Sequence, residues 1–143
     1  MESLLAEYPV IVESPVIWGD MDAYEHVNNT VYFRYFESAR IAFFDQLKFK
    51  EVKDETGIGP ILASTQCRFR IPLTYPDTVS IGARVSDVQG DRFTMHYRVV
   101  SHQHKKVAAE GEGLLIAYDY KALTKAALPE IIYQRIQKLG SDQ

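Results

Sequence analysis

The chain has 143 residues, of which 46% are hydrophobic and 24% charged, and its formal net charge is -3. These values predict one globular domain over residues 1–143, and they exclude a basic nucleic-acid-binding surface and the roughly 20-residue apolar run of a membrane span. A single cysteine and an N-terminus without a basic leader segment further predict a cytoplasmic protein that has no disulfide and no metal cluster.

The first predicted element is a strand. Residues 8–18, YPVIVESPVIW, are rich in β-forming side chains and contain Pro15, which places an edge or an interruption in the strand. Residues 19–29, GDMDAYEHVNN, contain glycine, aspartate and asparagine as turn formers. They predict a loop.

A long helix is predicted next, from Asn29 to Leu47. This stretch contains neither glycine nor proline, and its apolar side chains cover most of a helical wheel. Asn28 or Asn29 is the expected N-cap. We expect the helix to be buried on most sides.

The remainder of the chain predicts mainly strands. A charged connector at 48–60 precedes them, and a short helix at 128–139 follows. Short joints between the strands predict hairpins and therefore an antiparallel meander. The predicted fold is α+β, with a bent five-stranded antiparallel sheet wrapped around one long central helix. The last four predicted strands cover residues 61–71, 77–88, 92–101 and 106–119.

One motif is long and specific. Residues 18–40, WGDMDAYEHVNNTVYFRYFESAR, resemble the pattern D-x-D-x-x-G-H-V-N-N-x-x-Y-x-x-Y-x-E-x-A-R of the hotdog-fold acyl-CoA thioesterases, in the 4-hydroxybenzoyl-CoA thioesterase-like branch. Residues 69–85, FRIPLTYPDTVSIGARV, are similar to a second and looser pattern of that family. Glu25 and Pro76 each stand where the family patterns usually have glycine.

Thioester hydrolysis requires a group that activates water or attacks the carbonyl, and donors that hold the developing oxyanion. The first amides of a helix, here near Asn29 and Thr30, are suitable donors. From the residues alone, Asp20 and Asp22 are as suitable for shaping a turn as for catalysis. The resemblance implies that Asp22 is the catalytic carboxylate, whereas Asp20 is structural.

Several neighbouring residues complete the expected site. His26 is expected beside Asp22 and Asn29 in the catalytic group, although an orienting role for this histidine remains open. Glu37 and Arg40 are spaced for an i, i+3 pair, but a helix carboxylate such as Glu37 is the reactive group in another thioesterase branch. The expected substrate contacts are Asn28, Thr30, Tyr32 and Glu25.

The cysteine, two of the histidines and four of the basic residues of the chain could be functional, but each has a structural role as the alternative. Cys67 has no motif around it and is expected to be a small buried hydrophobe rather than a nucleophile. His102 and His104 lack the cysteine or carboxylate company of a metal site. Four basic residues suit either coenzyme A phosphates or a solvated surface. They are Arg68, Arg70, Lys105 and Lys106.

The resemblance implies an acyl-CoA or acyl-carrier-protein substrate, no bound metal or organic cofactor, and a homodimer or homotetramer. In such an assembly the sheets join edge to edge, and the acyl-CoA site lies at the protomer boundary. A non-catalytic acyl-CoA or carrier-protein binder is the alternative, and Asp22 argues against it. A hotdog dehydratase is disfavoured, because the Asp/His motif of those relatives is absent. The acyl group itself stays open.

Overall fold

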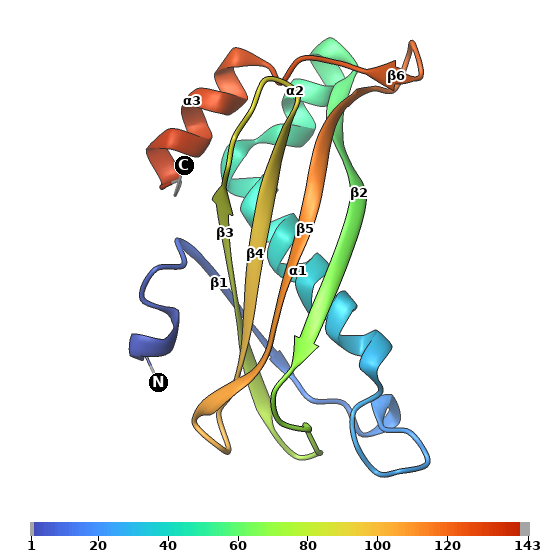
Figure 1. The fold of residues 1–143 in the computed structure, drawn as a ribbon, viewed down its shortest axis with the longest axis vertical. Coiled ribbons are helices and arrows are strands. Elements are labelled where there is room, and N and C mark those ends of the chain that lie inside the picture. Colours follow the sequence, from blue (N-terminus) through green and yellow to red (C-terminus); the bar gives the residue numbers. More distant parts are fainter. Residues whose placement is uncertain (1, 141–143) are drawn as a thin grey trace.

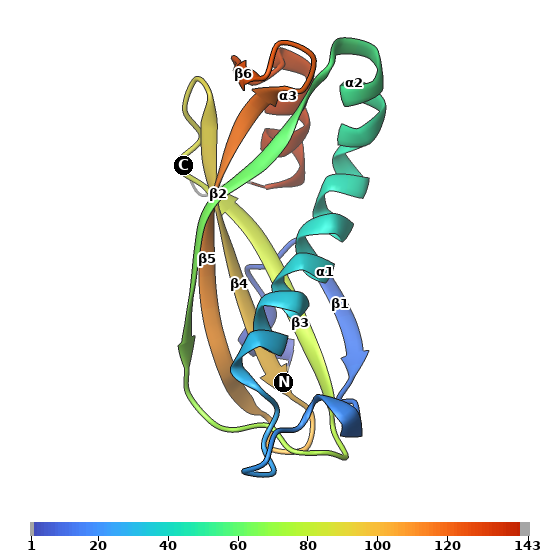
Figure 2. The same ribbon diagram turned by 90° about the vertical axis from the view of Figure 1, so that its right-hand side faces the viewer.

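The computed structural model describes residues 2–140, and it shows a curved antiparallel sheet with helix α1 lying across its concave face (Figures 1 and 2). The predicted α+β fold is confirmed, including the five-stranded bent sheet, the long central helix and the short C-terminal helix. A two-residue strand, β6, is added beside β5. The helical elements are η1 (Glu2–Leu5), η2 (Trp18–Asp20), α1 (Asn29–Leu47), α2 (Phe49–Thr56) and α3 (Glu130–Leu139). The strands are β1 (Val10–Pro15), β2 (Ile58–Phe69), β3 (Thr78–Ser86), β4 (Arg92–Ser101), β5 (Lys106–Asp119) and β6 (Thr124–Lys125).

The strand order differs from the predicted meander. Strands β3, β4 and β5 do form one, but the order of the sheet is β1-β3-β4-β5-β2, so β2 pairs with β5 and leaves β1 to pair with β3 (Figure 1). The segment between β2 and β3 contains Pro72 and Pro76, which lack the backbone donors of a tight hairpin ladder. This segment therefore carries the chain to the far side of the sheet, and β2 becomes an edge strand.

The predicted charged connector at 48–60 is wrong. Most of it is helix α2, in which Phe49 and Val52 lie three residues apart and are buried together. Lys48, with a φ of 52°, separates α2 from α1, and Gly57, with a φ of 81°, ends α2. Residues after Gly57 already belong to β2.

Helix α1 has the predicted bounds, and Asn28 is its N-cap. Only one side of the helix is buried within the chain, because Arg34, Glu37 and Ile41 lie exposed on the other side. Burial on most sides is therefore not achieved within one chain. The buried side consists of Val31, Tyr32, Tyr35, Phe36, Ala39, Phe43 and Leu47. Within residues 2–140, no helix combines the length and the apolar character needed to cross a lipid bilayer.

The middle of α1 is fixed against the sheet by close packing. Gly111 of β5 faces Phe36, and a Cβ atom at this glycine would collide with the phenyl ring. Phe36 stacks on Tyr97 of β4, with ring centroids 4.8 Å apart. The Tyr97 hydroxyl in turn accepts a hydrogen bond from Nη1 of Arg40 at 3.1 Å. The height and rotation of α1 above the sheet are thus set by aromatic contacts.

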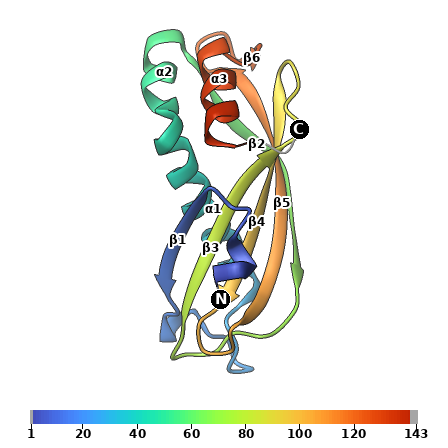
Figure 3. The same ribbon diagram turned by 90° about the vertical axis from the view of Figure 1, so that its left-hand side faces the viewer.

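The N-terminal segment covers part of the opposite face of the sheet (Figure 3). Tyr8 packs against Gly82 and lies 5.3 Å from the guanidinium carbon of Arg98. Arg98 also donates to the Leu4 carbonyl at 3.0 Å and pairs with Glu110 at 2.7 Å. Burial raises the pKa of Glu110, but arginines on both sides outweigh it and hold this pKa below its usual range.

Candidate active site

The polar loop before α1 is a small hairpin. Met21 and Val27 form an antiparallel bridge, and the Asp22 amide donates to the His26 carbonyl at 2.9 Å. The Glu25 amide closes the turn by donating to the Asp22 carbonyl at 2.9 Å. Such a turn is usually completed by a residue in the left-handed region. Glu25 has a φ of 65° and fills that position.

Both ends of the hairpin are anchored by backbone hydrogen bonds. The Val27 amide donates to the Leu73 carbonyl at 2.9 Å, and the Asn28 amide donates to the Asp20 carbonyl at 3.0 Å. The Asp20 carboxylate also lies 3.8 Å from Nη1 of Arg34 on α1. Asp20 therefore joins the loop to the helix, as expected of a structural residue.

The Asp22 carboxylate lies on the exposed side of this hairpin. Its Oδ1 atom accepts a hydrogen bond from the Tyr24 amide at 2.9 Å, which orients the side chain. Within residues 2–140, the other carboxylate oxygen has no hydrogen-bond partner. Asp22 is thus an oriented carboxylate with one oxygen available for chemistry.

The start of α1 leaves one amide free. The Asn28 side chain accepts from the Thr30 amide at 3.0 Å and from the Thr30 hydroxyl at 2.7 Å, and the Val31 amide donates to the Asn28 carbonyl. The expected pair of donors, Asn29 and Thr30, is thereby reduced to one. Among the described residues, the Asn29 amide has no acceptor. It is the donor that a substrate oxygen can use.

An apolar cavity of about 320 Å³ opens beside this free amide. Tyr32 forms one wall, and its ring meets that of Phe69 edge to face at a centroid distance of 5.0 Å. Burial raises the pKa of Tyr32 to about 12, so its hydroxyl stays neutral at physiological pH. The lining residues are Val27, Asn29, Tyr32, Phe69, Arg70, Ile71 and Pro72.

A second cavity, of about 280 Å³, lies further along the groove between α1 and β2. The predicted ion pair between Glu37 and Arg40 is wrong, because Arg40 bonds instead to the hydroxyl of Tyr97, a residue distant in sequence. Glu37 has no hydrogen-bond or ion-pair partner in the described part of the chain. The lining residues are Thr30, Phe33, Arg34, Glu37, Arg40, Leu62 and Thr65.

The structure groups most of the predicted site residues around the start of α1. Three of them project from the hairpin and are exposed, namely Asp22, Glu25 and His26. Asn28 is occupied as the cap, Asn29 and Tyr32 line the apolar cavity, and Thr30 lines the second one.

Sequence reasoning missed the cavity-lining residues at the end of β2 and directly after it. Phe69, Ile71 and Pro72 lie in the apolar cavity together with Asn29. The looser motif at 69–85 begins with these residues, so it is the signal that could have identified them. Its first part, from Phe69 at the end of β2 to Pro72, forms a wall of the cavity, and its later part is strand β3.

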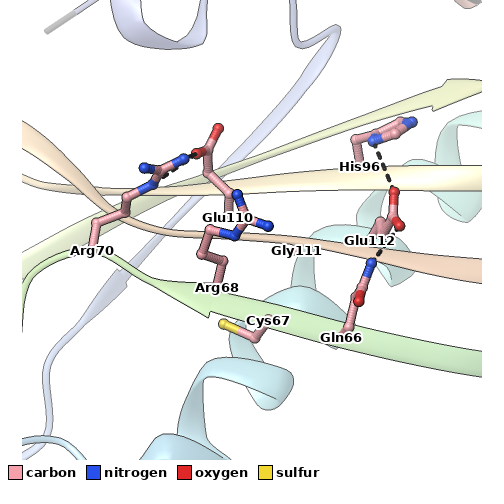
Figure 4. A pocket seen from close by; sticks show the side chains of 8 residues that line it. All are labelled: Gln66, Cys67, Arg68, Arg70, His96, Glu110, Gly111 and Glu112. Carbon is pink, nitrogen blue, oxygen red and sulfur yellow. Dashed lines mark hydrogen bonds and ion pairs between the residues drawn. The ribbon is translucent and has the colours of Figure 1, made fainter.

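The other candidate residues named from the sequence include three that contact other side chains of the fold, namely Cys67, His102 and Arg70. Cys67 is half-buried rather than fully buried as expected, and burial raises its pKa to about 11, which keeps it a neutral thiol. Nε2 of His102 lies 2.8 Å from the Ser80 hydroxyl. On the face of the sheet away from α1, Arg70 pairs with Glu110 at 2.7 Å in a cavity of about 480 Å³, and Arg68 lies exposed beside them (Figure 4).

Replacing Glu25 by glycine tests the role of the left-handed position. Glycine adopts a φ of 65° without a Cβ penalty, so we expect the hairpin to be retained. Turnover of the best substrate should stay within about tenfold, a barrier change near 1.4 kcal/mol, while the preference among acyl groups changes. Steady-state kinetics on several acyl thioesters measure both quantities. Loss of activity on every substrate, with an unchanged circular dichroism spectrum, would move Glu25 into the catalytic group.

Comparisons with known proteins agree on one family. The family model described as "Thioesterase-like superfamily" matches residues 16–136. A Thermus thermophilus structure, described as a thioesterase complexed with coenzyme A and Zn, is 28% identical, with a TM-score of 0.82 over 93% of this chain and 95% of that one.

Two further relatives extend this comparison. An Aquifex aeolicus protein named "Putative esterase" is 30% identical over 64% of this chain and 72% of its own length. A 1,4-dihydroxy-2-naphthoyl-CoA thioesterase from Synechocystis is 15% identical and shares the fold, with a TM-score of 0.79 over 91% of this chain and 96% of its own.

Proposed function

Because this chain belongs to the thioesterase-like superfamily, we propose that it hydrolyses an acyl-CoA thioester to a free carboxylic acid and coenzyme A. Asp22 acts as the nucleophile or general base, and the Asn29 amide holds the carbonyl oxygen. The observation that carries the proposal is the free Asn29 amide, which lines an apolar cavity and begins the helix that follows directly on the loop with the oriented Asp22 carboxylate. The coenzyme A complex of the Thermus relative supports the choice of thiol.

The general-base route needs only groups of this chain and water. Asp22 removes a proton from a water molecule, and the hydroxide oxygen of that water forms a bond to the carbonyl carbon of the thioester. The carbonyl oxygen becomes an oxyanion that accepts a hydrogen bond from the Asn29 amide. The carbon–sulfur bond then breaks, and the leaving thiolate takes the proton held by Asp22. One water is consumed for each acid and thiol formed.

The nucleophilic route differs in its intermediate. Asp22 itself adds to the carbonyl carbon and displaces the thiolate, which leaves a mixed anhydride. Water then cleaves the anhydride and regenerates the carboxylate. In a single turnover in ¹⁸O-labelled water, label in the Asp22 side chain would establish this route, because it enters only when water attacks the aspartyl carbon of the anhydride. An unlabelled Asp22 is compatible with general-base catalysis and with attack of water on the acyl carbon of the anhydride. Either outcome is compatible with hydrolysis of the thioester.

Release of free thiol tests the activity directly. A panel of short, medium, long and aromatic acyl-CoAs is incubated with the protein, and the thiol is followed with a chromogenic disulfide. We expect turnover of at least one member that disappears in Asp22→Asn. Tight binding of acyl-CoA without release of thiol from any member would instead establish the non-catalytic binder.

We further expect the active form to be a homodimer or homotetramer. Strand β2 is long, pairs with β5 on one side only, and exposes Ile61, Leu62 and Phe69. Unpaired edges of this kind favour strand pairing between chains. A second copy on this edge would lie next to both cavities, since β2 contributes residues to each.

Sedimentation measures the oligomeric state. Wild type should sediment at a multiple of the 16.3 kDa chain mass at about micromolar concentration. Ala63 is exposed on β2, so Ala63→Lys places a charge on the edge and should dissociate the assembly. A fully active wild-type monomer would contradict this expectation.

A further inference from the structure

The cavity between α1 and β2 contains a cation that lacks a counterion. Arg40 is partly buried there, and within residues 2–140 its guanidinium makes one hydrogen bond, to the Tyr97 hydroxyl at 3.1 Å. Tyr97 is 1% exposed, and burial raises the pKa of its phenol, so this partner is neutral. The partly buried Arg98, by contrast, pairs with a carboxylate, that of Glu110, at 2.7 Å.

The packing of α1 leaves this groove as the path for an acyl group. Beneath the helix, the Phe36 ring fills the space above Gly111. The space above Gly113 is also occupied, because a Cβ atom added there would lie 3.1 Å from the Leu62 side chain and 3.7 Å from the Tyr97 hydroxyl. The groove beside the helix remains open. Thr30, which follows the free Asn29 amide, lines its second cavity.

Arg40 is the cation of this cavity that remains for an anion. Arg34 and Glu37 also line the cavity, but Nη1 of Arg34 already lies 3.8 Å from the Asp20 carboxylate. A guanidinium presents up to five N–H donors in a planar fork, and the bond to Tyr97 uses one of them. A carboxylate is the group whose charge and planar geometry match this fork. Glu37 opposes such a ligand, so its removal should strengthen binding.

We propose that the α1–β2 cavity selects acyl groups that end in a carboxylate, with Arg40 as the residue that binds this carboxylate. The inference rests on the proposed function, because the thioester at Asn29 places the acyl group in the groove. The substrate class is then the mono-thioester of a dicarboxylic acid, and an unsubstituted acyl chain of equal length is the poorer substrate.

Matched pairs of substrates provide the test. For several chain lengths, kcat/KM is measured for the ω-carboxyacyl-CoA and for its unsubstituted acyl-CoA, and their ratio is the selectivity. Wild type should favour the carboxylate member. Arg40→Gln, which keeps a donor for Tyr97, should lower the selectivity by about 10- to 100-fold, the usual effect of losing a charge-assisted hydrogen bond. Arg40→Lys should retain part of the selectivity, and Glu37→Gln should raise it.

Two controls separate selectivity from folding and from catalysis. Thermal melting shows whether each variant folds. Tyr97→Phe keeps the Arg40 guanidinium and removes only the hydroxyl that binds it, so selectivity should persist in that variant.

If no thioester is hydrolysed, the proposed function fails, and calorimetric binding of the same pairs measures selectivity instead. A wild-type ratio near one, or a ratio that Arg40→Gln leaves unchanged, would overturn the inference. A change in oligomeric state alone, with unchanged selectivity, would overturn it as well.

Discussion

Asp22→Asn should lower kcat by roughly 10²–10⁴-fold or more, because asparagine keeps the size of the side chain and removes the negative charge. The Asn29 amide and the apolar cavity are unaffected by this change, so acyl-CoA should still bind. Thiol release gives kcat, and calorimetry with a non-hydrolysable thioether analogue gives the affinity.

Neighbouring substitutions should have smaller effects on catalysis. Asp20→Asn retains the carbonyl that accepts from Asn28, so its effect should be far smaller than that of Asp22→Asn. Asn29→Ala retains the backbone amide and should be mild. Asn28→Ala removes the helix cap and should cost about 1 kcal/mol of stability. Near-normal kcat in Asp22→Asn, together with an inactive Glu37→Gln, would place the reactive carboxylate on α1 instead.

Gly111→Ala should destabilise the fold by about 1–3 kcal/mol, the range for overpacking a filled interior. The added methyl group would collide with the Phe36 ring, and it would lie 2.7 Å from the Gln66 carbonyl oxygen, which belongs to the backbone of β2 and cannot rotate away. Chemical denaturation measures the loss of free energy of unfolding. Because the methyl group pushes against α1, activity should fall as well.

A glycine elsewhere in the chain provides the matched control. A Cβ atom at Gly90 would meet nothing within 4 Å, so Gly90→Ala should be close to neutral. Combining Gly111→Ala with Phe36→Leu should cost less than the sum of the two single changes, since the smaller side chain makes room for the methyl group. Additive losses in this double variant would show that Phe36 is not the obstacle.

The sequence determined some elements because their causes are local. Helix α1 could be bounded at Asn29 and Leu47, since an uninterrupted apolar stretch and an asparagine cap lie within the segment itself. The loop that holds Asp22 was likewise predicted from its turn-forming residues, although its hairpin pairing was not. The family motif then distinguished Asp22 from Asp20, which the residue types alone did not.

Other features depend on contacts that are distant in sequence. Strand β2 could pair with either outer edge of the β3-β4-β5 meander, at β3 or at β5, and it pairs with β5. The alternation of apolar and polar side chains along β2 does not specify which of the two edges it joins. The spacing of Glu37 and Arg40 predicted a local pair, but the Tyr97 hydroxyl, 57 positions away, binds the arginine. Helix α2 was missed because its apolar face consists of only Phe49 and Val52 in a charged segment.

The anchoring of the hairpin before α1 has an evolutionary consequence. Its shape is maintained by main-chain bonds, such as those from Val27 to Leu73 and from Asn28 to Asp20, which do not depend on the side chains of these residues. The side chains of Tyr24, Glu25 and His26 project into solvent and are not required for these bonds. Tyr24 and His26 can therefore be exchanged through single substitutions without compensating changes elsewhere in the fold, whereas the φ of 65° at position 25 restricts replacements there to residues that tolerate the left-handed region.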